Sequence, residues 1–141
     1  MRVDHVGYAV HDIESATPSF LSLGYRLCEA ETEDRERGVK ILFLSDTGGT
    51  KIELIAPLGE NSPVSAWLKK NGNSPYHICY ESDNIAADVA ELKKKGFISV
   101  EPPLPALALS GRQVAFLYGK HTGLIELVET DKNNGPEMNR T

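Results

Sequence analysis

The stretch VDHVGYAVHDI at residues 3–13 is matched later in the chain by PYHICYESDNI at residues 75–85. Both stretches carry a histidine at the same point, and these histidines, His5 and His77, lie 72 positions apart. Val, Ile and Tyr recur at alternating positions around each histidine, which is typical of a β-strand. Because chance similarity rarely keeps its register over such a distance, we interpret the chain as two copies of one module.

Two further matches extend the repeat across both halves with an offset of 73. They are LFL at 42–44 with AFL at 115–117, and IEL at 52–54 with IEL at 125–127. Only one net residue of insertion therefore accumulates between the halves.

Each half reads as a strand, a helix and three further strands. The later strands are expected near residues 25–30, 40–45 and 51–55, and again near 98–100, 113–118 and 124–128. The sequence thus predicts two βαβββ modules of the α+β class, 1–57 and 74–129, within one domain that spans 1–129.

The helices of the two modules begin and end at matching signals. Asp12 and Asn84 are placed to cap them by accepting a backbone N–H, and Gly24 and Gly96 end them. Pro18 lies inside the first helix and costs it a backbone hydrogen bond, so we expect an irregular first turn there.

Between the modules, residues 62–72 predict a short linker helix. Ser62 suits its N-cap, Pro63 its first position and Gly72 its end. The last segment, 130–141, is polar and has no periodic apolar residues, so we expect it to be disordered.

Composition places the chain among ordinary globular proteins. Of 141 residues, 40% are hydrophobic and 25% are charged, and the net charge is −5. The apolar runs have the length of strands and the basic residues are scattered, so we expect neither a membrane span nor a nucleic-acid partner. The start of the chain does not resemble a secretory signal, and two distant cysteines fit a reducing compartment, so a cytoplasmic location is expected.

Four residues stand at equivalent places in the two halves: the first strand supplies His5 or His77, and the last supplies Glu53 or Glu126. Taken singly, each is more often an ordinary strand residue than a ligand. A carboxylate buried among aliphatic residues, however, needs a partner charge. A divalent cation supplies that charge for both carboxylates, and the recurrence of the same pair favours a metal site.

Together these features resemble the vicinal oxygen chelate superfamily, which includes glyoxalases, bleomycin resistance proteins and dioxygenases. The resemblance covers about 3–129 and is strongest toward methylmalonyl-CoA epimerases and bacterial glyoxalase I-like proteins. DHVGYAV at 4–10, TKIELIAPLGENSP at 50–63 and VAFL at 114–117 carry it. It implies a curved mixed sheet around a central metal, bound by the His/Glu/His/Glu set.

The resemblance also implies a chemistry, in which a proton moves beside a carbonyl chelated by the metal. Two imidazoles and two carboxylates suit Ni²⁺, Co²⁺ or Zn²⁺. Glu126 is the first candidate for the base and Glu53 the second. The substrate would be a thioester or a hemithioacetal. Arg112 and Lys120 are the first candidate contacts for a coenzyme A phosphate, followed by Lys69 and Lys70. A homodimer is expected.

Two departures from the epimerase pattern leave the substrate open. The turn at 119–123 is shorter than in epimerases and resembles that of some glyoxalase I-like proteins, and the loop 102–111 is more apolar. Other members of the same superfamily give further alternatives. A drug-binding resistance protein would lack the metal ligands, and a ring-cleaving dioxygenase would use two histidines and one carboxylate.

Overall fold

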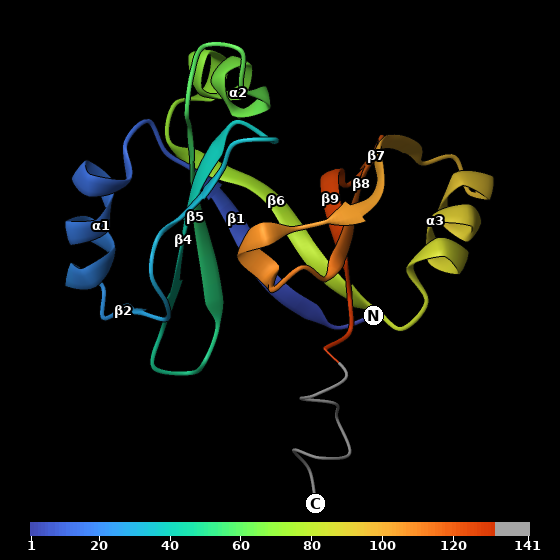
Figure 1. The fold of residues 1–141 in the computed structure, drawn as a ribbon, viewed down its shortest axis with the longest axis horizontal. Coiled ribbons are helices and arrows are strands. Elements are labelled where there is room, and N and C mark those ends of the chain that lie inside the picture. Colours follow the sequence, from blue (N-terminus) through green and yellow to red (C-terminus); the bar gives the residue numbers. More distant parts are fainter. Residues whose placement is uncertain (132–141) are drawn as a thin grey trace, which may run out of the picture. The chain divides into compact units, whose positions relative to one another are not determined.

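The computed structural model describes residues 1–131 and has an α+β fold with mixed strand pairing, as predicted. The chain forms two compact units. The first unit is His5–Ile78, and the second consists of Met1–Asp4 together with the chain from Cys79 onward. Two strands, β1 (Val3–Ala9) and β6 (Ser74–Ser82), pass from one unit into the other, so each unit contains a part of both (Figure 1).

In the first unit the strands follow the order β2-β4-β5-β1-β6, and β3 pairs with β4. Their bounds are Arg26–Leu27 for β2, Thr32–Asp34 for β3, Val39–Ser45 for β4 and Lys51–Pro57 for β5. β1 runs parallel to β5, whereas β2, β3 and β5 each pair antiparallel with β4. Helix α1 (Ile13–Ser22) packs against β4 and β5. The core between them consists of Val10, Ile13, Leu42, Leu44, Ile52, Leu54 and Ala56.

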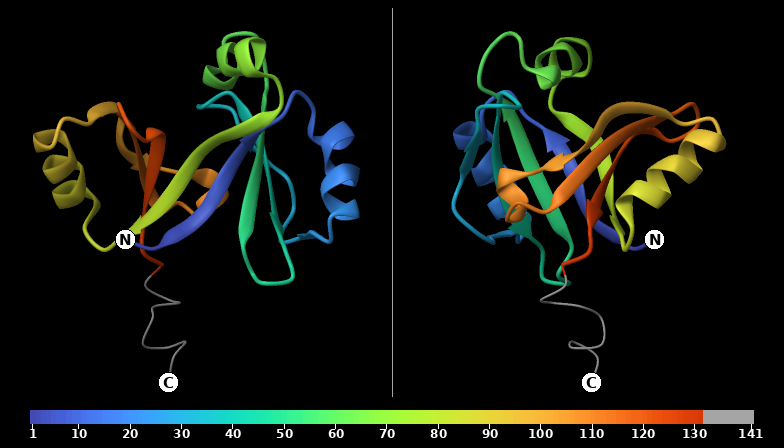
Figure 2. Two further views of the ribbon diagram at one scale, coloured as in Figure 1. Left: turned by 180° about the vertical axis from the view of Figure 1, so that it is seen from behind. Right: turned by 45° about the vertical axis from the view of Figure 1, so that its right-hand side comes forward.

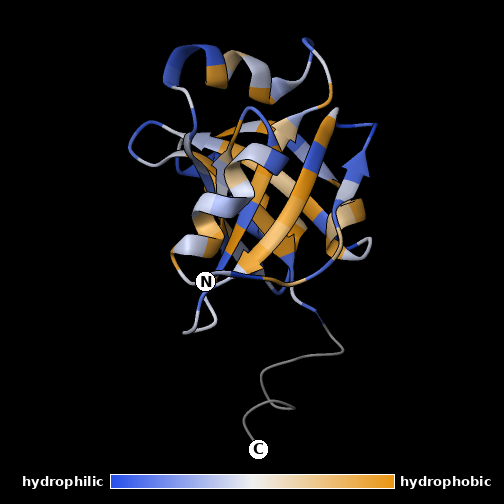
Figure 3. Cartoon of the chain, turned by 90° about the vertical axis from the view of Figure 1, so that its left-hand side faces the viewer, coloured by the Kyte–Doolittle hydropathy of each residue, from blue (hydrophilic) through white to orange (hydrophobic). Residues whose placement is uncertain are grey.

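In the second unit the order is β6-β9-β8-β7. β7 spans Ile98–Pro105, β8 Gln113–Gly119 and β9 Gly123–Glu129, and a short 3₁₀ helix, η1 (Leu107–Leu109), follows β7. Helix α3 (Ile85–Lys94) packs against β7, β8 and β9 (Figure 2). Hydrophobic residues are concentrated on the strands (Figure 3). The core between α3 and these strands consists of Ile85, Val89, Ala115, Leu117, Ile125 and Leu127.

The repeat recognised in the sequence is reproduced in local structure. Asp12 accepts a hydrogen bond from the Ser15 backbone N–H at 3.0 Å, and Asn84 accepts one from Ala87 at 3.1 Å. These caps occupy equivalent positions in the two halves, since both pairs of residues are offset by 72. The antiparallel ladders match as well, because each places a phenylalanine opposite the candidate glutamate of its half.

The helix boundaries lie close to the predicted ones, but one expected irregularity is absent. The linker helix α2 (Pro63–Asn71) has Ser62 as N-cap and Gly72 as C-cap, as expected. α1, by contrast, is regular from Ile13 onward, so the irregular first turn expected from Pro18 is wrong. The Thr17 hydroxyl donates to the Ile13 carbonyl at 2.7 Å.

Two strand predictions are corrected. The segment 25–30 does not form one strand, because β2 is only two residues long and β3 begins at Thr32. β7 is longer than the predicted 98–100 and extends to Pro105, with two irregularities in its register against β8.

Of the tail 130–141, only Thr130 and Asp131 lie within the described residues. Thr130 donates its backbone N–H to the Ser82 carbonyl at 3.0 Å and its hydroxyl to Asp83 at 2.7 Å. The expectation of disorder concerns mainly 132–141, outside the described residues. Within 1–131, no helix has the length and apolar character that crossing a membrane requires.

Candidate metal centre

Three neighbouring strands of the first unit place three of the predicted ligands on one face. His5 lies on β1, Glu53 on the adjacent β5 and His77 on β6, which follows β1 in the strand order. Glu53 is the register partner of Gly7, two residues after His5 on β1. Since side chains two residues apart share a face of a strand, this register places His5 and Glu53 on the same side of the sheet.

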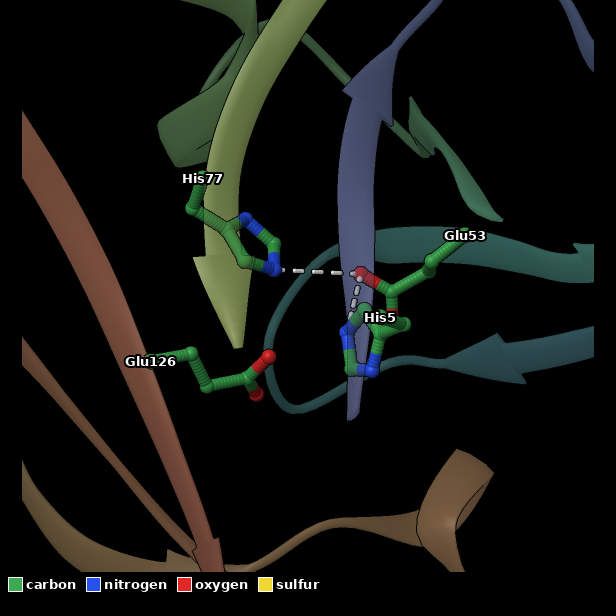
Figure 4. A group of neighbouring side chains, drawn as sticks. All are labelled: His5, Glu53, His77 and Glu126. Carbon is green, nitrogen blue, oxygen red and sulfur yellow. Dashed lines mark ion pairs between the residues drawn. The ribbon is translucent and has the colours of Figure 1, made fainter. Parts of the chain in front are cut away.

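The donor atoms of these three side chains converge. Glu53 Oε1 lies 3.6 Å from His5 Nε2 and 3.4 Å from His77 Nε2 (Figure 4). One ligand atom of each residue lies within 4.8 Å of the others. A cation bound at 2.0–2.2 Å would hold its donor atoms about 3.0–3.5 Å apart. The two measured separations are therefore close to those of ligands around a common ion, so this donor set fits a divalent metal.

The site is shielded from solvent, and its charges are interdependent. The side chains of His5 and His77 are fully buried, and that of Glu53 is only 4% exposed. Burial alone raises the pKa of Glu53, because a buried carboxylate loses its hydration. The charges and N–H groups of His5 and His77 outweigh this effect and lower the pKa of Glu53 below its usual value. Glu53 is thus a carboxylate that carries a negative charge at neutral pH.

Aromatic rings hold the two histidines in place. The His5 ring meets the edge of Phe43 at a centroid distance of 5.2 Å, and Phe43 is the register partner of Glu53 on β4. The His77 ring lies 5.7 Å from that of His5 and 5.4 Å from Tyr76. Packing of this kind restricts the rotamers of the candidate ligands, as a preformed metal site requires.

Glu126, the fourth predicted ligand, belongs to β9 of the second unit and is also drawn in Figure 4. It is 4% exposed, and its register partner on β8 is Phe116. Its neighbours along β9, Ile125 and Leu127, belong to the apolar core of this unit. Glu126 is therefore a carboxylate in an apolar strand, as the sequence predicted.

The predicted phosphate-binding cations have different surroundings. Arg112 is half-buried and donates to two backbone carbonyls, those of Leu109 and Glu129, both at 3.2 Å. This guanidinium therefore connects the segment after η1 to the end of β9. Lys120 is exposed in the turn between β8 and β9, and Lys69 and Lys70 are exposed near the end of α2. The role of these residues toward a substrate stays a prediction.

The fold and the donor set define a class of protein. Residues 4–116 match the model of the Glyoxalase/Bleomycin resistance protein/Dioxygenase superfamily. The chain belongs to this superfamily, and the resemblance seen in its motifs is confirmed.

Within the superfamily, the chain is similar to methylmalonyl-CoA epimerases. It is 40% identical to the human mitochondrial methylmalonyl-CoA epimerase over 130 residues, which is 89% of this chain and 72% of that protein. It is 35% identical to the ethylmalonyl-CoA/methylmalonyl-CoA epimerase of Cereibacter sphaeroides over 120 residues, 84% of this chain and 89% of the relative. A solved methylmalonyl-CoA epimerase in complex with methylmalonyl-CoA and NH₄⁺ is 31% identical, with a TM-score of 0.81 over 96% of this chain and 98% of that one. The chain is thus an epimerase-like member of its family with a candidate metal site.

One feature of the centre did not emerge from the sequence. Phe43 and Phe116 were recognised as repeat partners, but their position opposite the two glutamates depends on strand register. The equal offset of the LFL/AFL and IEL/IEL pairs is the signal that could have predicted it, because equal spacing between antiparallel strands preserves the pairing.

Proposed function

We propose that this protein is a divalent-metal-dependent epimerase that inverts the α-carbon of a malonyl-type coenzyme A thioester. The observation that carries the proposal is the convergence of His5, Glu53 and His77 around one buried point. The relatives described above supply the substrate class, since one of them was solved with methylmalonyl-CoA.

We further propose that Glu126 completes the ligand set. It is the repeat partner of Glu53, it is buried, and it faces the same kind of register partner. Two neutral imidazoles, two carboxylates and a dication carry no net charge together, which offsets the cost of burying the glutamates. Mixed nitrogen and oxygen donors suit Ni²⁺, Co²⁺ or Zn²⁺.

A bound dication would stabilise the negative charge that develops on the thioester oxygen when the α-proton leaves. The residues of the chain have to move that proton. Epimerisation needs one group that accepts it and another that returns a proton to the opposite face of the carbon. Glu126 is our first candidate for the base and Glu53 the second, and together they would form the required pair.

The coenzyme A portion of the substrate carries phosphates and needs cations. Lys120 is exposed, so its ammonium group is accessible to a phosphate. Arg112 would have to bind phosphate while it keeps its bonds to the Leu109 and Glu129 carbonyls. Formation of a homodimer and location in the cytoplasm stay predictions from the sequence.

A second candidate function is a glyoxalase I-like lyase acting on a hemithioacetal. The observation that favours it is the short turn between β8 and β9, in which Gly119 and Gly123 close the ladder. The proton chemistry would be the same, and only the body of the substrate would differ.

The first experiment is to measure metal by mass spectrometry in protein purified without chelators, and to assay it with two substrates. We expect about one transition-metal ion per chain, and metal-dependent deuterium exchange at the α-carbon of methylmalonyl-CoA in D₂O. The hemithioacetal of methylglyoxal and glutathione serves as the alternative substrate. Turnover of the hemithioacetal alone would favour the lyase. Absence of metal after reconstitution with Ni²⁺, Co²⁺ and Zn²⁺ would leave a binding protein.

A further inference from the structure

Gly7 lies beside three of the candidate metal ligands, His5, Glu53 and His77, although it carries no functional group. On β1 it follows His5 by two residues, so the two positions share a face of the strand. Its register partner on β5 is Glu53. Position 7 therefore belongs to the strand surface from which the candidate ligands project.

The imidazole of His77 occupies the space where a side chain on residue 7 would begin. A Cβ at this position would lie 2.2 Å from His77 Cε1, 2.5 Å from Nδ1 and 2.6 Å from Nε2. All three distances are far shorter than the contact distance of non-bonded carbon atoms, which is about 3.5–4.0 Å. No side chain at position 7 is compatible with the observed position of this ring.

The backbone itself does not call for glycine here. The glycines of the described residues that have a positive φ do not include Gly7, so its conformation is accessible to other residues. The repeat partner of Gly7 is Cys79, fully buried on β6, so the equivalent strand of the second half accepts a side chain. Space for His77 is the remaining reason for a glycine.

We propose that Gly7 is a positioning residue for the metal centre, because its missing side chain forms the recess that holds the His77 imidazole beside Glu53. A methyl group at this position would displace a side-chain ring rather than the backbone. The ring would move away from Glu53 Oε1, which now lies 3.4 Å from its Nε2. This inference rests on the proposed metal site.

The test is Gly7→Ala, with Co²⁺ affinity measured by calorimetry. We expect affinity to fall about 10- to 100-fold, the usual effect of disturbing groups that orient a ligand. Two other glycines provide controls. A Cβ at Gly59 meets nothing within 4 Å, whereas one at Gly119 would lie 2.5 Å from Phe97 and from Thr122. Gly59→Ala should change neither stability nor affinity, and Gly119→Ala should lower stability but leave Co²⁺ affinity unchanged.

A second measurement separates the recess from a general packing defect. Urea unfolding in the presence of a chelator is compared for Gly7→Ala, His77→Ala and the double variant. Gly7→Ala should lower the midpoint in the original protein but not in the His77→Ala background, because the clashing ring is gone. The same conclusion follows if Gly7→Ala fails to fold and the double variant folds.

An equal loss in both backgrounds, or unchanged Co²⁺ affinity in Gly7→Ala, would overturn the role of Gly7. If the unaltered protein binds none of Co²⁺, Ni²⁺ and Zn²⁺, the proposed metal site fails. The unfolding comparison still decides in that case whether Gly7 makes room for His77.

Discussion

The two halves of the chain agree in the residues that shape the backbone and differ in the segments around them. Both begin their helix at a side-chain cap, Asp12 or Asn84, and both place a phenylalanine opposite a buried glutamate. At the strand position two residues after the histidine, however, the first half has Gly7 and the second half has Cys79. The candidate ligands are thus the same in both halves, whereas the neighbouring residue that leaves or fills space beside them differs.

The connections between strands differ even more. In the first half, the turn after β4 is stabilised by Asp46, whose carboxylate accepts from the backbone N–H groups of Gly48 and Thr50 at 2.9 and 2.8 Å. In the second half, the turn between Gly119 and Gly123 is closed by the ladder itself, with φ of 73° at Gly123. The halves therefore share a scaffold that carries the candidate ligands. Their loops differ, and specificity for a substrate would arise there.

The largest expected effect comes from removing the equivalent carboxylates. If both halves supply a carboxylate ligand, Glu53→Gln and Glu126→Gln should each lower metal content. Each should also reduce kcat about 10²- to 10⁴-fold, the range for loss of a group that moves a proton. Metal analysis and deuterium exchange measure the two effects. Glu36→Gln, at an exposed position, is the control and should behave as the original protein does.

An unequal result would show that the two halves do not contribute equally to the site. If Glu126→Gln keeps its metal and its activity, the second half contributes His77 but no carboxylate ligand. The ligand set would then be the two histidines and one carboxylate of the first unit.

The next effect concerns equivalent core residues. Leu44 and Leu117 are both fully buried, one in the core of each unit. Truncation to alanine should lower the free energy of unfolding by about 2–5 kcal/mol in each case. Leu23→Ala is the control, since this leucine is 75% exposed.

This pair of variants also tests whether the units unfold together. The chain has one tryptophan, Trp67, which lies in the first unit. Because β1 and β6 run through both units, we expect Leu117→Ala to shift the Trp67 fluorescence transition as much as it shifts the circular dichroism transition. A shift in circular dichroism alone would mean that the units unfold separately.

Much of the fold could be predicted because local signals agreed with the repeat. The caps at Asp12 and Asn84 are such signals. β7 was predicted too short, because Pro102, Pro103 and Pro105 suggest a loop. β7 lies at the end of the strand order in its unit, where prolines are tolerated since one side of the strand needs no partner. Whether a strand lies at the end of the strand order depends on the whole sheet, so the sequence of the segment alone does not reveal it.

The candidate site, like the fold, could be predicted only in part from the sequence. His5, Glu53, His77 and Glu126 emerged from the sequence because a ligand pair that occurs twice is a strong pattern. Gly7 did not emerge, because its significance depends on His77 on a neighbouring strand, 70 positions away. Residues that act by leaving space are defined by their neighbours, so a single sequence gives no signal for them.

The smallest effect distinguishes the two helix caps by their charge. Asn84→Ala should cost about 1 kcal/mol, and because an amide does not titrate, this cost should not change between pH 7 and pH 2. For Asp12, the Ser15 hydroxyl and the Ser15 backbone N–H hold the pKa of the carboxyl below its usual value of 3.8. A lowered pKa in the folded state means that the stabilisation is fully present above pH 3.8 and is lost as the pH falls through the folded-state value. The cost of Asp12→Ala should therefore shrink in acid.

The matched control for this last difference is Ser15→Ala, which removes the hydroxyl bond at 2.6 Å but keeps the backbone bond at 3.0 Å. The pKa of Asp12, followed by NMR titration, should rise toward its usual value, because the hydroxyl is the larger of the two causes. It should not reach that value, because the backbone N–H of residue 15 still donates to the carboxylate. An identical pH dependence of Asp12→Ala and Asn84→Ala would contradict the argument. The two caps would then be equivalent in mechanism as well as in position, and the charge of Asp12 would contribute nothing to its helix.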